Sequence, residues 1–377
     1  MSFQDEYFMA HALRLAEKGL YITHPNPRVG CVLVKDGGIV GEGHTQKAGK
    51  DHAEVDALKK AGGKARGATA YVTLEPCCFQ GKTGPCTKAL IEAGISRLVY
   101  AIEDPHPKVR GEGLRQLLAA GIEVSGPLMA SSAKKINRGF FKVHESGLPF
   151  VTCKLAMSLD GKVALANGRS QWITSQSARQ DVQRLRAANS AIVTGVQTII
   201  ADNPLLTVRA EDLGFENRVF ARQVASIPRL RVVLDSSGRM PADARILGSG
   251  NAAGSCMGHV LIATCGPDYH LPDVETINVR ADKSARVDLE ILLRELAKRE
   301  MNDVLFECGP SLAGSLLESG LMDELIIYMS GRILGHKGRS LFEMSEVQIL
   351  DNAPKMDIIE VRHIGDDLKL VMRPPGR

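Results

Sequence analysis

The chain has 377 residues, 44% hydrophobic and 24% charged, which is the balance of a globular protein long enough for two hydrophobic cores. Its formal net charge of +4 is small for this length and is not concentrated in any run of like charges, which argues against a nucleic-acid or membrane partner. The N-terminus is acidic and amphipathic rather than a secretory signal, and we find no apolar stretch long enough to span a bilayer. The eight cysteines are scattered, so we expect a cytoplasmic protein rather than a disulfide framework.

The first part of the chain alternates helical and strand-like segments. Apolar residues recur at helical spacing from Asp5 until Gly19, a natural helix stop. Residues 28–45 predict two strands joined around the Asp36-Gly37-Gly38 turn. Further helices are expected in 52–63, 86–95 and 105–121, and further strands in 67–77, 97–102 and 122–126. This pattern predicts a sheet covered by helices in an α/β domain.

A polar, basic segment that ends in turn-forming residues follows at 130–149, and we place a domain boundary near Gly147. The predicted domains are therefore 1–147 and 148–377. The α/β alternation restarts in the second domain, where 210–227 is the least regular segment. The expected strands are 150–158, 190–198, 229–237, 258–265, 302–309 and 323–330, and the expected helices are 175–189, 289–300 and 311–320.

The stretch DHAEV admits two interpretations. Asp51 and Glu54 fit a helix capping box, which would make His52 an ordinary residue of the first turn. His52 and Glu54 also begin the pattern H-x-E, followed by Pro-Cys and a further cysteine, which is typical of zinc deaminases. In that pattern zinc lowers the pKa of its bound water to about 7, and the glutamate moves a proton from the water to the leaving amine.

The segment EPCCFQGKTGPC offers three cysteines for such a site. Cys77 and Cys86 each follow a proline, and Cys86 directly precedes a helical segment whose positive end favours thiolate, the form that binds metal. With His52 they make a three-ligand zinc set that leaves one position open, as in catalytic sites. Eight residues separate Cys77 from Cys86, compared with two in the general signature. The alternative is a closed structural site with Cys78 as fourth ligand, although adjacent cysteines chelate one zinc poorly.

The motifs HPNPRVGCVLV, HAEVDAL, TLEPCCFQGKTGPC and EDPHPKVRGEG resemble the deaminase half of the bifunctional riboflavin-biosynthesis deaminase/reductases. The resemblance implies a cytidine-deaminase-like α/β/α domain and a longer gap between the cysteines. It also implies the site residues. These are the zinc ligands His52, Cys77 and Cys86, the catalytic Glu54, and the substrate-binding residues Asn26, Lys82 and Asp104. The chain departs from the family at Cys78-Phe79 and at His106, where asparagine is common.

The second half contains no G-x-G-x-x-G after a strand, and only LFECGPSLAGSLL runs from a strand through a Gly/Ser loop into a helix, as a phosphate-binding loop does. This segment, with TCKLAMSLDGKVA, SQWITS and RLRAANSAIVTGVQTIIADNPLLTVR, resembles the reductase half of the same family, whose α/β fold is similar to dihydrofolate reductase. The resemblance assigns NADPH to Ala156, Trp172, Thr198, Asp202, Gly309, Pro310, Ser311, Leu312, Ala313, Gly314 and Ser315. It assigns substrate to Ser170, Arg186, Leu206, Arg209 and Glu307.

Three further sets of polar residues have candidate roles in this half. The two arginines assigned to the substrate, Arg186 and Arg209, suit a dianionic phosphate, because a guanidinium group binds phosphate bidentately. Lys154 and Asp160 either orient sugar hydroxyls or form a salt bridge. Ser236, Ser237 and Arg239 either hold the 2′-phosphate of NADPH or form a plain β-turn.

The implied function is a two-step enzyme. It first deaminates 2,5-diamino-6-(5-phosphoribosylamino)pyrimidin-4-one with zinc, and then reduces the ribosyl group with NADPH to give 5-amino-6-(5-phosphoribitylamino)uracil. We expect small-molecule substrates and a homo-oligomer. Two alternatives are a nucleic-acid or free-base deaminase with an unrelated appended domain, and a non-catalytic zinc module fused to a nucleotide-binding regulator. The charge and the lack of an aromatic-basic surface argue against nucleic acid.

Overall fold

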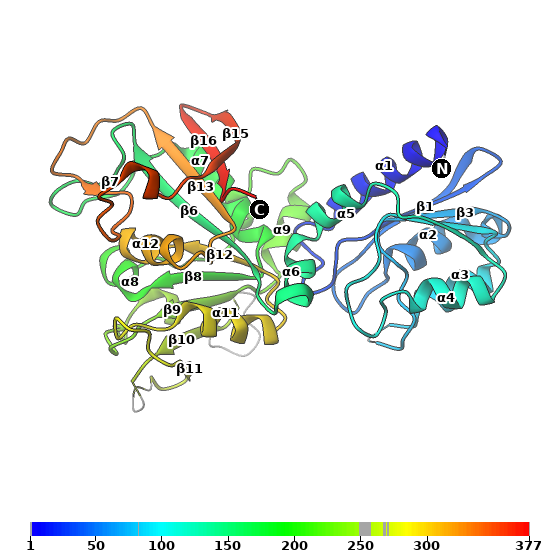
Figure 1. Cartoon of the computed structure of the whole chain (residues 1–377), viewed down its shortest axis with the longest axis horizontal. Helices are drawn as coiled ribbons and strands as arrows, with labels where there is room; N and C mark the ends of the chain where they lie inside the picture. The colour runs from blue at the N-terminus through cyan, green and yellow to red at the C-terminus, as the bar shows by residue number, and fades with distance from the viewer. Residues whose placement is uncertain (1, 82, 249–257, 267–268, 270, 377) are drawn as a thin grey trace. The chain divides into compact units, whose positions relative to one another are not determined.

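The computed structural model describes residues 2–81, 83–248, 258–266, 269 and 271–376. They form two compact units, Met1–Gly147 and Leu148–Arg377, drawn in Figure 1 with the chain coloured from blue to red. Among the described residues, no helix is both long and apolar enough to cross a membrane.

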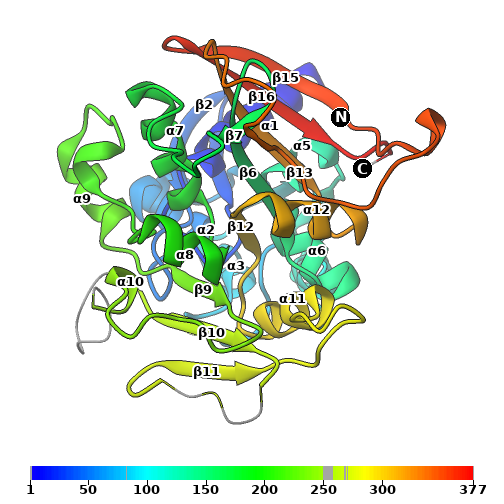
Figure 2. The ribbon, with the colours of Figure 1, turned by 90° about the vertical axis from the view of Figure 1, so that its left-hand side faces the viewer.

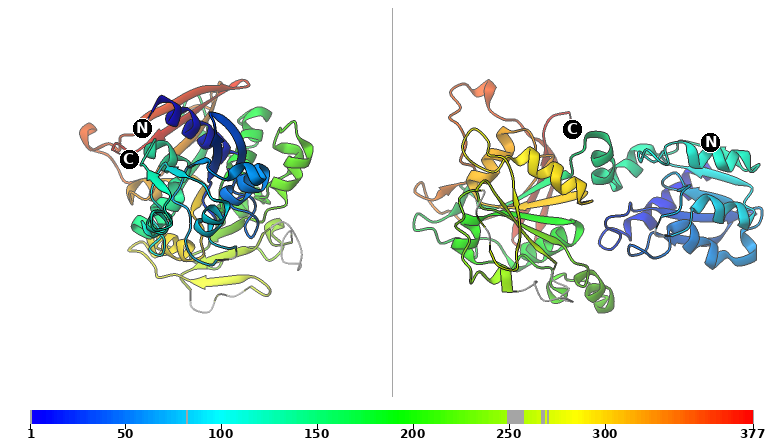
Figure 3. Two further views of the ribbon diagram at one scale, coloured as in Figure 1. Left: turned by 90° about the vertical axis from the view of Figure 1, so that its right-hand side faces the viewer. Right: turned by 90° about the horizontal axis from the view of Figure 1, so that it is seen from below.

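The first unit is a five-stranded sheet between two layers of helices (Figures 1 and 3). Successive residues of a strand face opposite sides of a sheet, and here both sides are buried. Cys31 and Leu33 pack with α2, α3 and α4, while Val32 and Val34 pack with α1 and α5. The strands, in sheet order, are β2 (Gly38–His44), β1 (Gly30–Lys35), β3 (Thr69–Val72), β4 (Arg97–Tyr100) and β5 (Glu123–Ser125). The helices are α1 (Phe3–Glu17), α2 (Ala53–Ala61), η1 (Gly62–Ala65), α3 (Cys86–Ala93), α4 (Glu112–Ala119), α5 (Ala130–Ile136) and α6 (Arg138–Ser146).

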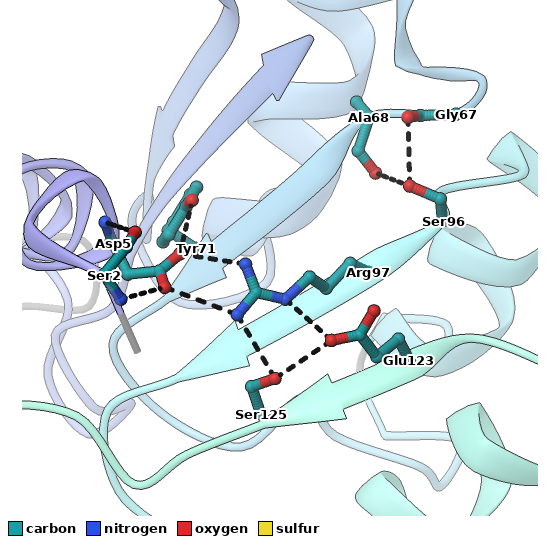
Figure 4. Close-up of polar contacts among 9 residues, drawn as sticks. All are labelled: Ser2, Asp5, Gly67, Ala68, Tyr71, Ser96, Arg97, Glu123 and Ser125. Carbon is teal, nitrogen blue, oxygen red and sulfur yellow. Dashed lines mark hydrogen bonds and ion pairs between the residues drawn. The ribbon is translucent and has the colours of Figure 1, made fainter. Parts of the chain in front are cut away.

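A buried carboxylate fastens α1 to this sheet (Figure 4). Asp5 is 3% exposed and accepts hydrogen bonds from Arg97 on β4, the Tyr71 hydroxyl on β3 and the backbone N–H of Ser2, each at 2.8–2.9 Å. Burial opposes its charge, but the hydrogen bonds from Arg97, Ser2 and Tyr71 outweigh it and hold the pKa of Asp5 well below its usual value. The carboxylate is therefore ionised in the folded unit.

The second unit is built on a nine-stranded sheet that is parallel except for its last two strands. Figure 2 shows α7, α8 and α9 on one side of this sheet and α11 and α12 on the other. The strands, in sheet order, are β11 (Glu275–Asn278), β10 (Val260–Thr264), β9 (Leu230–Leu234), β8 (Ala191–Gly195), β12 (Asp303–Glu307), β6 (Phe150–Ser158), β13 (Glu324–Ser330), β16 (Asp367–Arg373) and β15 (Asp357–Ile364). The small strands β7 (Lys162–Ala164) and β14 (Arg339–Ser340) pair separately.

Several helices of this unit contribute residues to the cavity described below. The helices of the unit are α7 (Gln176–Ala188), α8 (Val196–Asp202), η2 (Ala210–Asp212), α9 (Arg218–Ala225), α10 (Arg245–Gly248), α11 (Leu289–Lys298), α12 (Pro310–Glu318) and η3 (Leu350–Asn352).

Three sequence expectations about elements are corrected. The segment 210–227 contains η2 and α9, a helix of only eight residues that is capped by Asn217 and buries Ala221 and Val224. The strand expected over 190–198 ends at Gly195, and α8 follows at once despite its β-branched residues. The segment 130–149 forms two helices before the chain turns at Gly147, whose φ of 71° suits glycine.

Candidate functional site

The first unit brings three candidate metal ligands together. His52 is the N-cap of α2, Cys77 lies in the loop after β3, and Cys86 is the first residue of α3. The Nδ1 atom of His52 lies 3.6 Å from the Cys77 sulfur and 3.3 Å from the Cys86 sulfur, and all three ligand atoms lie within 4.8 Å of one another. Among the described residues, these three are the group of His, Cys, Asp or Glu side chains that lie close enough together to hold a metal ion.

These distances fit a tetrahedral zinc ion. Zinc–nitrogen bonds of about 2.0–2.1 Å and zinc–sulfur bonds of about 2.3 Å place nitrogen and sulfur about 3.5 Å apart at tetrahedral angles. The two measured distances, 3.6 and 3.3 Å, lie on either side of that value. A set of one imidazole and two thiols with a fourth position open matches the donor chemistry of catalytic zinc.

The electrostatics of the two cysteines also favour a cation between them. The pKa of Cys77 falls to about 4, because hydrogen bonds from the Cys86 thiol, from His52 and from the Cys86 backbone N–H outweigh the cost of burial. The pKa of Cys86 is raised, because its thiol donates to Cys77 and because burial and the neighbouring charges oppose a second thiolate. Two thiolates this close repel each other, so a bound cation is what would stabilise both.

Thr83 fixes the orientation of the histidine, a role that sequence reasoning missed. Its hydroxyl lies 3.2 Å from Nε2 of His52, on the opposite side of the ring from the sulfurs. If Nε2 carries the proton and donates it to Thr83, Nδ1 keeps its lone pair for the metal. The position of Thr83 in the loop between the two cysteines was the available signal.

Glu54 occupies the second position of α2 and is 3% exposed. Burial raises its pKa to about 7, and the charge of Cys77 adds to the shift. A carboxyl group near that pKa exchanges protons readily at neutral pH. The capping-box interpretation is wrong, because His52 is the N-cap without a side-chain cap, and Asp51 instead pairs with Lys59 at 2.6 Å.

Close packing sets the position of α2. A Cβ atom on Gly43 of β2 would lie 2.1 Å from the carbonyl oxygen of Ala53, so only glycine lets the strand approach the start of the helix. The loop after Cys77 has a comparable support in Glu75, which is 2% exposed. Its carboxylate accepts backbone N–H groups from Asp104, Gly111 and Gly113 at 2.9–3.2 Å.

The expected substrate-binding residues of this unit have different surroundings. Asp104 is 7% exposed, and burial raises its pKa to about 7. Asn26 is half-buried in the loop before β1, and Lys82 lies outside the described residues. His106, whose ring stacks on Phe79 at a centroid distance of 5.6 Å, accepts the backbone N–H of Lys108.

Cys78 stands apart from the metal cluster. Its thiol donates to the carbonyl of Lys108 at 3.4 Å, and burial raises its pKa. The candidate ligand group contains the neighbouring Cys77 and does not contain Cys78.

The second unit contains a cavity of about 1420 Å³ formed by β6, α7, α8, β12 and α12 with their connecting loops. Most of the residues that the sequence assigned to cofactor and substrate line its wall. They are Lys154, Ala156, Ser170, Trp172, Arg186, Thr198, Asp202, Leu206, Arg209, Glu307, Gly309, Pro310, Ser311, Leu312 and Ser315.

Two expected cofactor residues are not in the wall. Ala313 is fully buried in the hydrophobic core of the unit. A Cβ atom on Gly314 would lie 2.0 Å from the carbonyl oxygen of Glu343, so this glycine serves packing between α12 and the later chain. Both face away from the cavity because side chains of a helix turn by about 100° per residue, so a continuous run cannot line one surface.

Charged groups dominate one part of the cavity wall. Arg186 of α7 donates to both carboxylate oxygens of Glu307 at 2.5 and 3.0 Å. The pKa of Glu307 stays below its usual value, because the Arg186 charge and hydrogen bonds outweigh burial. Arg209 donates to Asp212, and Ser170 donates to Asp202 at 3.4 Å.

Sequence reasoning missed several cavity residues and left others undecided. The Arg179 guanidinium lies 4.8 Å from the exposed Trp172 ring, a cation–π contact at the cavity. Asp160 is held by the backbone N–H groups of Leu334 and Gly335 and does not pair with Lys154. Three wall residues, Ser236, Ser237 and Arg239, lie on the turn after β9, and Arg245 and Arg286 from other segments add positive charge to the cavity wall.

Comparisons with known proteins agree with this division of the chain. Residues 2–102 match the family model of the cytidine and deoxycytidylate deaminase zinc-binding region, and residues 149–370 match the RibD C-terminal domain. The riboflavin biosynthesis protein RibD of Escherichia coli K12 is 46% identical, over 97% of this chain and 98% of its own length.

Solved structures extend the similarity to three dimensions. Acinetobacter baumannii RibD, at 40% identity, covers 98% of this chain and 99% of its own, with a TM-score of 0.89. The diaminohydroxyphosphoribosylaminopyrimidine deaminase/5-amino-6-(5-phosphoribosylamino)uracil reductase of Thermotoga maritima is 33% identical, with the same coverage and a TM-score of 0.83. The chain belongs to the RibD family of riboflavin biosynthesis proteins and is a bifunctional deaminase and reductase with zinc and NADPH as its cofactors.

Proposed function

We propose that the deaminase resides in Met1–Gly147 and the reductase in Leu148–Arg377, and that they act in that order on one pyrimidine ribosyl phosphate. The observation that carries the proposal is the geometry of His52, Cys77 and Cys86, with the buried carboxyl group of Glu54 beside them. A three-ligand site with an adjacent proton carrier supports hydrolysis rather than a structural metal.

In the proposed deamination, His52, Cys77 and Cys86 hold the zinc, and Glu54 moves the protons. Zinc bound there would supply a water of lowered pKa as the nucleophile. Glu54 would accept a proton from the water that attacks C2 of 2,5-diamino-6-(5-phosphoribosylamino)pyrimidin-4-one, the carbon whose amino group is absent from the uracil product. Glu54 then delivers a proton to the departing amino group, so that water is consumed, ammonia leaves and a carbonyl remains. The proposed positions of Asn26, Asp104 and Lys82 are around the pyrimidine and its phosphate.

In the proposed reduction, the cavity of the second unit holds NADPH and the deaminated product together. Pockets for a single small ligand typically measure roughly 300–1,000 Å³. The cavity, at about 1420 Å³, is larger, which suits a dinucleotide and a sugar phosphate bound together. We assign Arg186 and Arg209 to the substrate phosphate and Lys154 to the sugar oxygens. NADPH bound at Thr198, Asp202 and the start of α12 would supply the hydride that converts ribosyl to ribityl.

The proposed setting is a homo-oligomer in the cytoplasm. Strand β15 is the edge of the large sheet and exposes Ile358, Ile359 and Val361, each more than half accessible. The unpaired backbone groups and exposed apolar side chains of such an edge strand offer a surface for pairing with another chain. Sedimentation at several protein concentrations tests the assembly, and a purely monomeric chain would contradict it. The seven described cysteines are free thiols, which supports a reducing compartment.

The test of the function supplies the diaminopyrimidine ribosyl phosphate with and without NADPH and identifies the products by mass. Without NADPH we expect only the species in which an amino group has become a carbonyl. With NADPH we expect that species to gain two hydrogens. Reduction before deamination, or no deamination by zinc-loaded protein, would contradict the proposed order.

A further inference from the structure

Lys154 is a cation in the cavity wall whose N–H donors are not engaged by any of the described residues. It lies on β6, between Glu307 and the ring of Tyr328 on β13. No hydrogen bond or ion pair of its ammonium is formed by the residues that the structure describes. Both oxygens of Glu307 are occupied by Arg186. The Glu307 charge favours the ammonium form of Lys154, and the aromatic face of Tyr328 lies on its other side, 5.9 Å from Nζ to the ring centroid.

The orientation of Tyr328 is itself fixed by residues that do not line the cavity. Tyr328 is fully buried, and its hydroxyl donates to Asp181 of α7 at 2.5 Å. The same carboxylate oxygen accepts Lys369 of β16 at 2.7 Å, and Arg362 lies 3.5 Å from the other oxygen. Lys369 also lies 5.7 Å from the centroid of the Tyr328 ring. The phenol therefore has one orientation, set by residues that are far apart in the sequence.

We propose that Tyr328 is a positioning residue of the reductase, which holds the Lys154 ammonium at the cavity surface through its ring face, and that Asp181 orients this ring. A carboxylate in the place of the ring would take up the N–H donors of the lysine. An aromatic face stabilises the charge and leaves those donors directed to the sugar oxygens of the substrate. The inference rests on the proposed reductase role of the cavity.

The electrostatic surroundings of Lys154 give the proposal a pH signature. Burial lowers its pKa, Glu307 and the thiols of Cys153 and Cys308 oppose that shift, and Arg186 adds to it. The Tyr328 ring favours the ammonium form, so its removal lowers the pKa of Lys154 further. If the ammonium is the working form, the alkaline limb of the pH profile moves to lower pH when the ring is lost.

The experiment compares Tyr328→Leu, which lacks the ring, with Tyr328→Phe, which keeps the ring and loses the hydroxyl. For Tyr328→Leu we expect kcat/KM for the ribosyl substrate to fall by about 3- to 30-fold, the range from an exposed to a desolvated cation–π contact. We also expect an acid shift of the alkaline limb and unchanged NADPH affinity. Tyr328→Phe should lose less, with the limb in place. If Tyr328→Leu is unstable, Tyr328→Met keeps more volume without an aromatic face.

A double-mutant cycle separates positioning from general structure. In a Lys154→Met background, Tyr328→Leu should cause no further loss of reduction, because the residue it positions is gone. The same fold loss in both backgrounds overturns the inference, as does a Tyr328→Leu enzyme with wild-type kinetics and pH profile. Full reduction by Lys154→Met would refute the assignment of Lys154 itself, and no reduction by the wild-type chain would refute the proposed function. Deaminase activity of each variant is the internal control.

Discussion

Removing the hydroxyl of Thr83 perturbs the metal centre without changing a metal ligand. Thr83→Val keeps the shape of the side chain and removes the group that lies 3.2 Å from Nε2 of His52. The half-buried Nε2–H is then left without its partner, which costs about 1–3 kcal/mol. At 1.4 kcal/mol for each factor of ten, zinc affinity should fall by about 5- to 150-fold, close to the 10- to 100-fold typical of groups behind a metal ligand, roughly.

The assay is competition for zinc between the metal-free protein and a chromophoric chelator of known affinity. Thr83→Ser is the matched control, because it restores the hydroxyl without the methyl group and should bind zinc nearly as the wild type does. At saturating zinc both variants should regain deaminase activity, since Glu54 and the ligands are intact. Wild-type zinc affinity in Thr83→Val would refute the proposed tautomer, in which His52 presents Nδ1 to the metal.

Three other predictions concern the ligands, the fold and the modularity of the chain. Metal analysis should find that Cys77→Ser loses zinc and Cys78→Ser keeps it; zinc loss only in the Cys78 variant would reverse the assignment. Asp5→Asn should lower the unfolding free energy of the first unit by about 3–5 kcal/mol at pH 7. Because the folded pKa of Asp5 is depressed, that difference should shrink as pH falls below about 4. The urea midpoint of deaminase activity measures it, while fluorescence of Trp172, the only tryptophan, controls for the other unit. A fragment of residues 148–377 should fold and bind NADPH more tightly than NADH, and a titration with the opposite preference would contradict this.

The metal cluster was accessible from sequence because each ligand has a local signature. Cys77 and Cys86 follow prolines, and His52 and Glu54 stand at the start of an apolar-periodic segment that becomes α2. The spacing of the cysteines alone did not decide whether Cys77 or Cys78 binds the metal. The resemblance implied Cys77, and in the folded chain it is the sulfur of Cys77 that lies with His52 and Cys86.

The polar networks of the second unit were not accessible from sequence. Asp181 and Tyr328 are separated by 147 residues, and Asp181 and Lys369 by 188, so no spacing rule relates them. Lys369 lies on β16, which forms a hairpin with β15 at the edge of the sheet. Both strands mix charged with β-branched residues, and this pattern is only weak sequence evidence for a strand. Within the run from Gly309 to Ser315, Ala313 and Gly314 do not line the cavity, because only one face of α12 meets it; a motif read from sequence does not distinguish the faces of a helix.

The central claim is that one chain performs two separable reactions, each with its own residues. The most direct measurement follows product masses for Glu54→Gln, for Arg186→Met, and for a mixture of the two proteins. Glu54→Gln should deaminate at least about 10²- to 10⁴-fold more slowly, yet bind zinc and still reduce added deaminated substrate. Arg186→Met should accumulate the deaminated ribosyl compound, and the mixture should form the ribityl product. Near wild-type deamination by Glu54→Gln, or loss of reduction in that variant with its fold intact, would contradict the account.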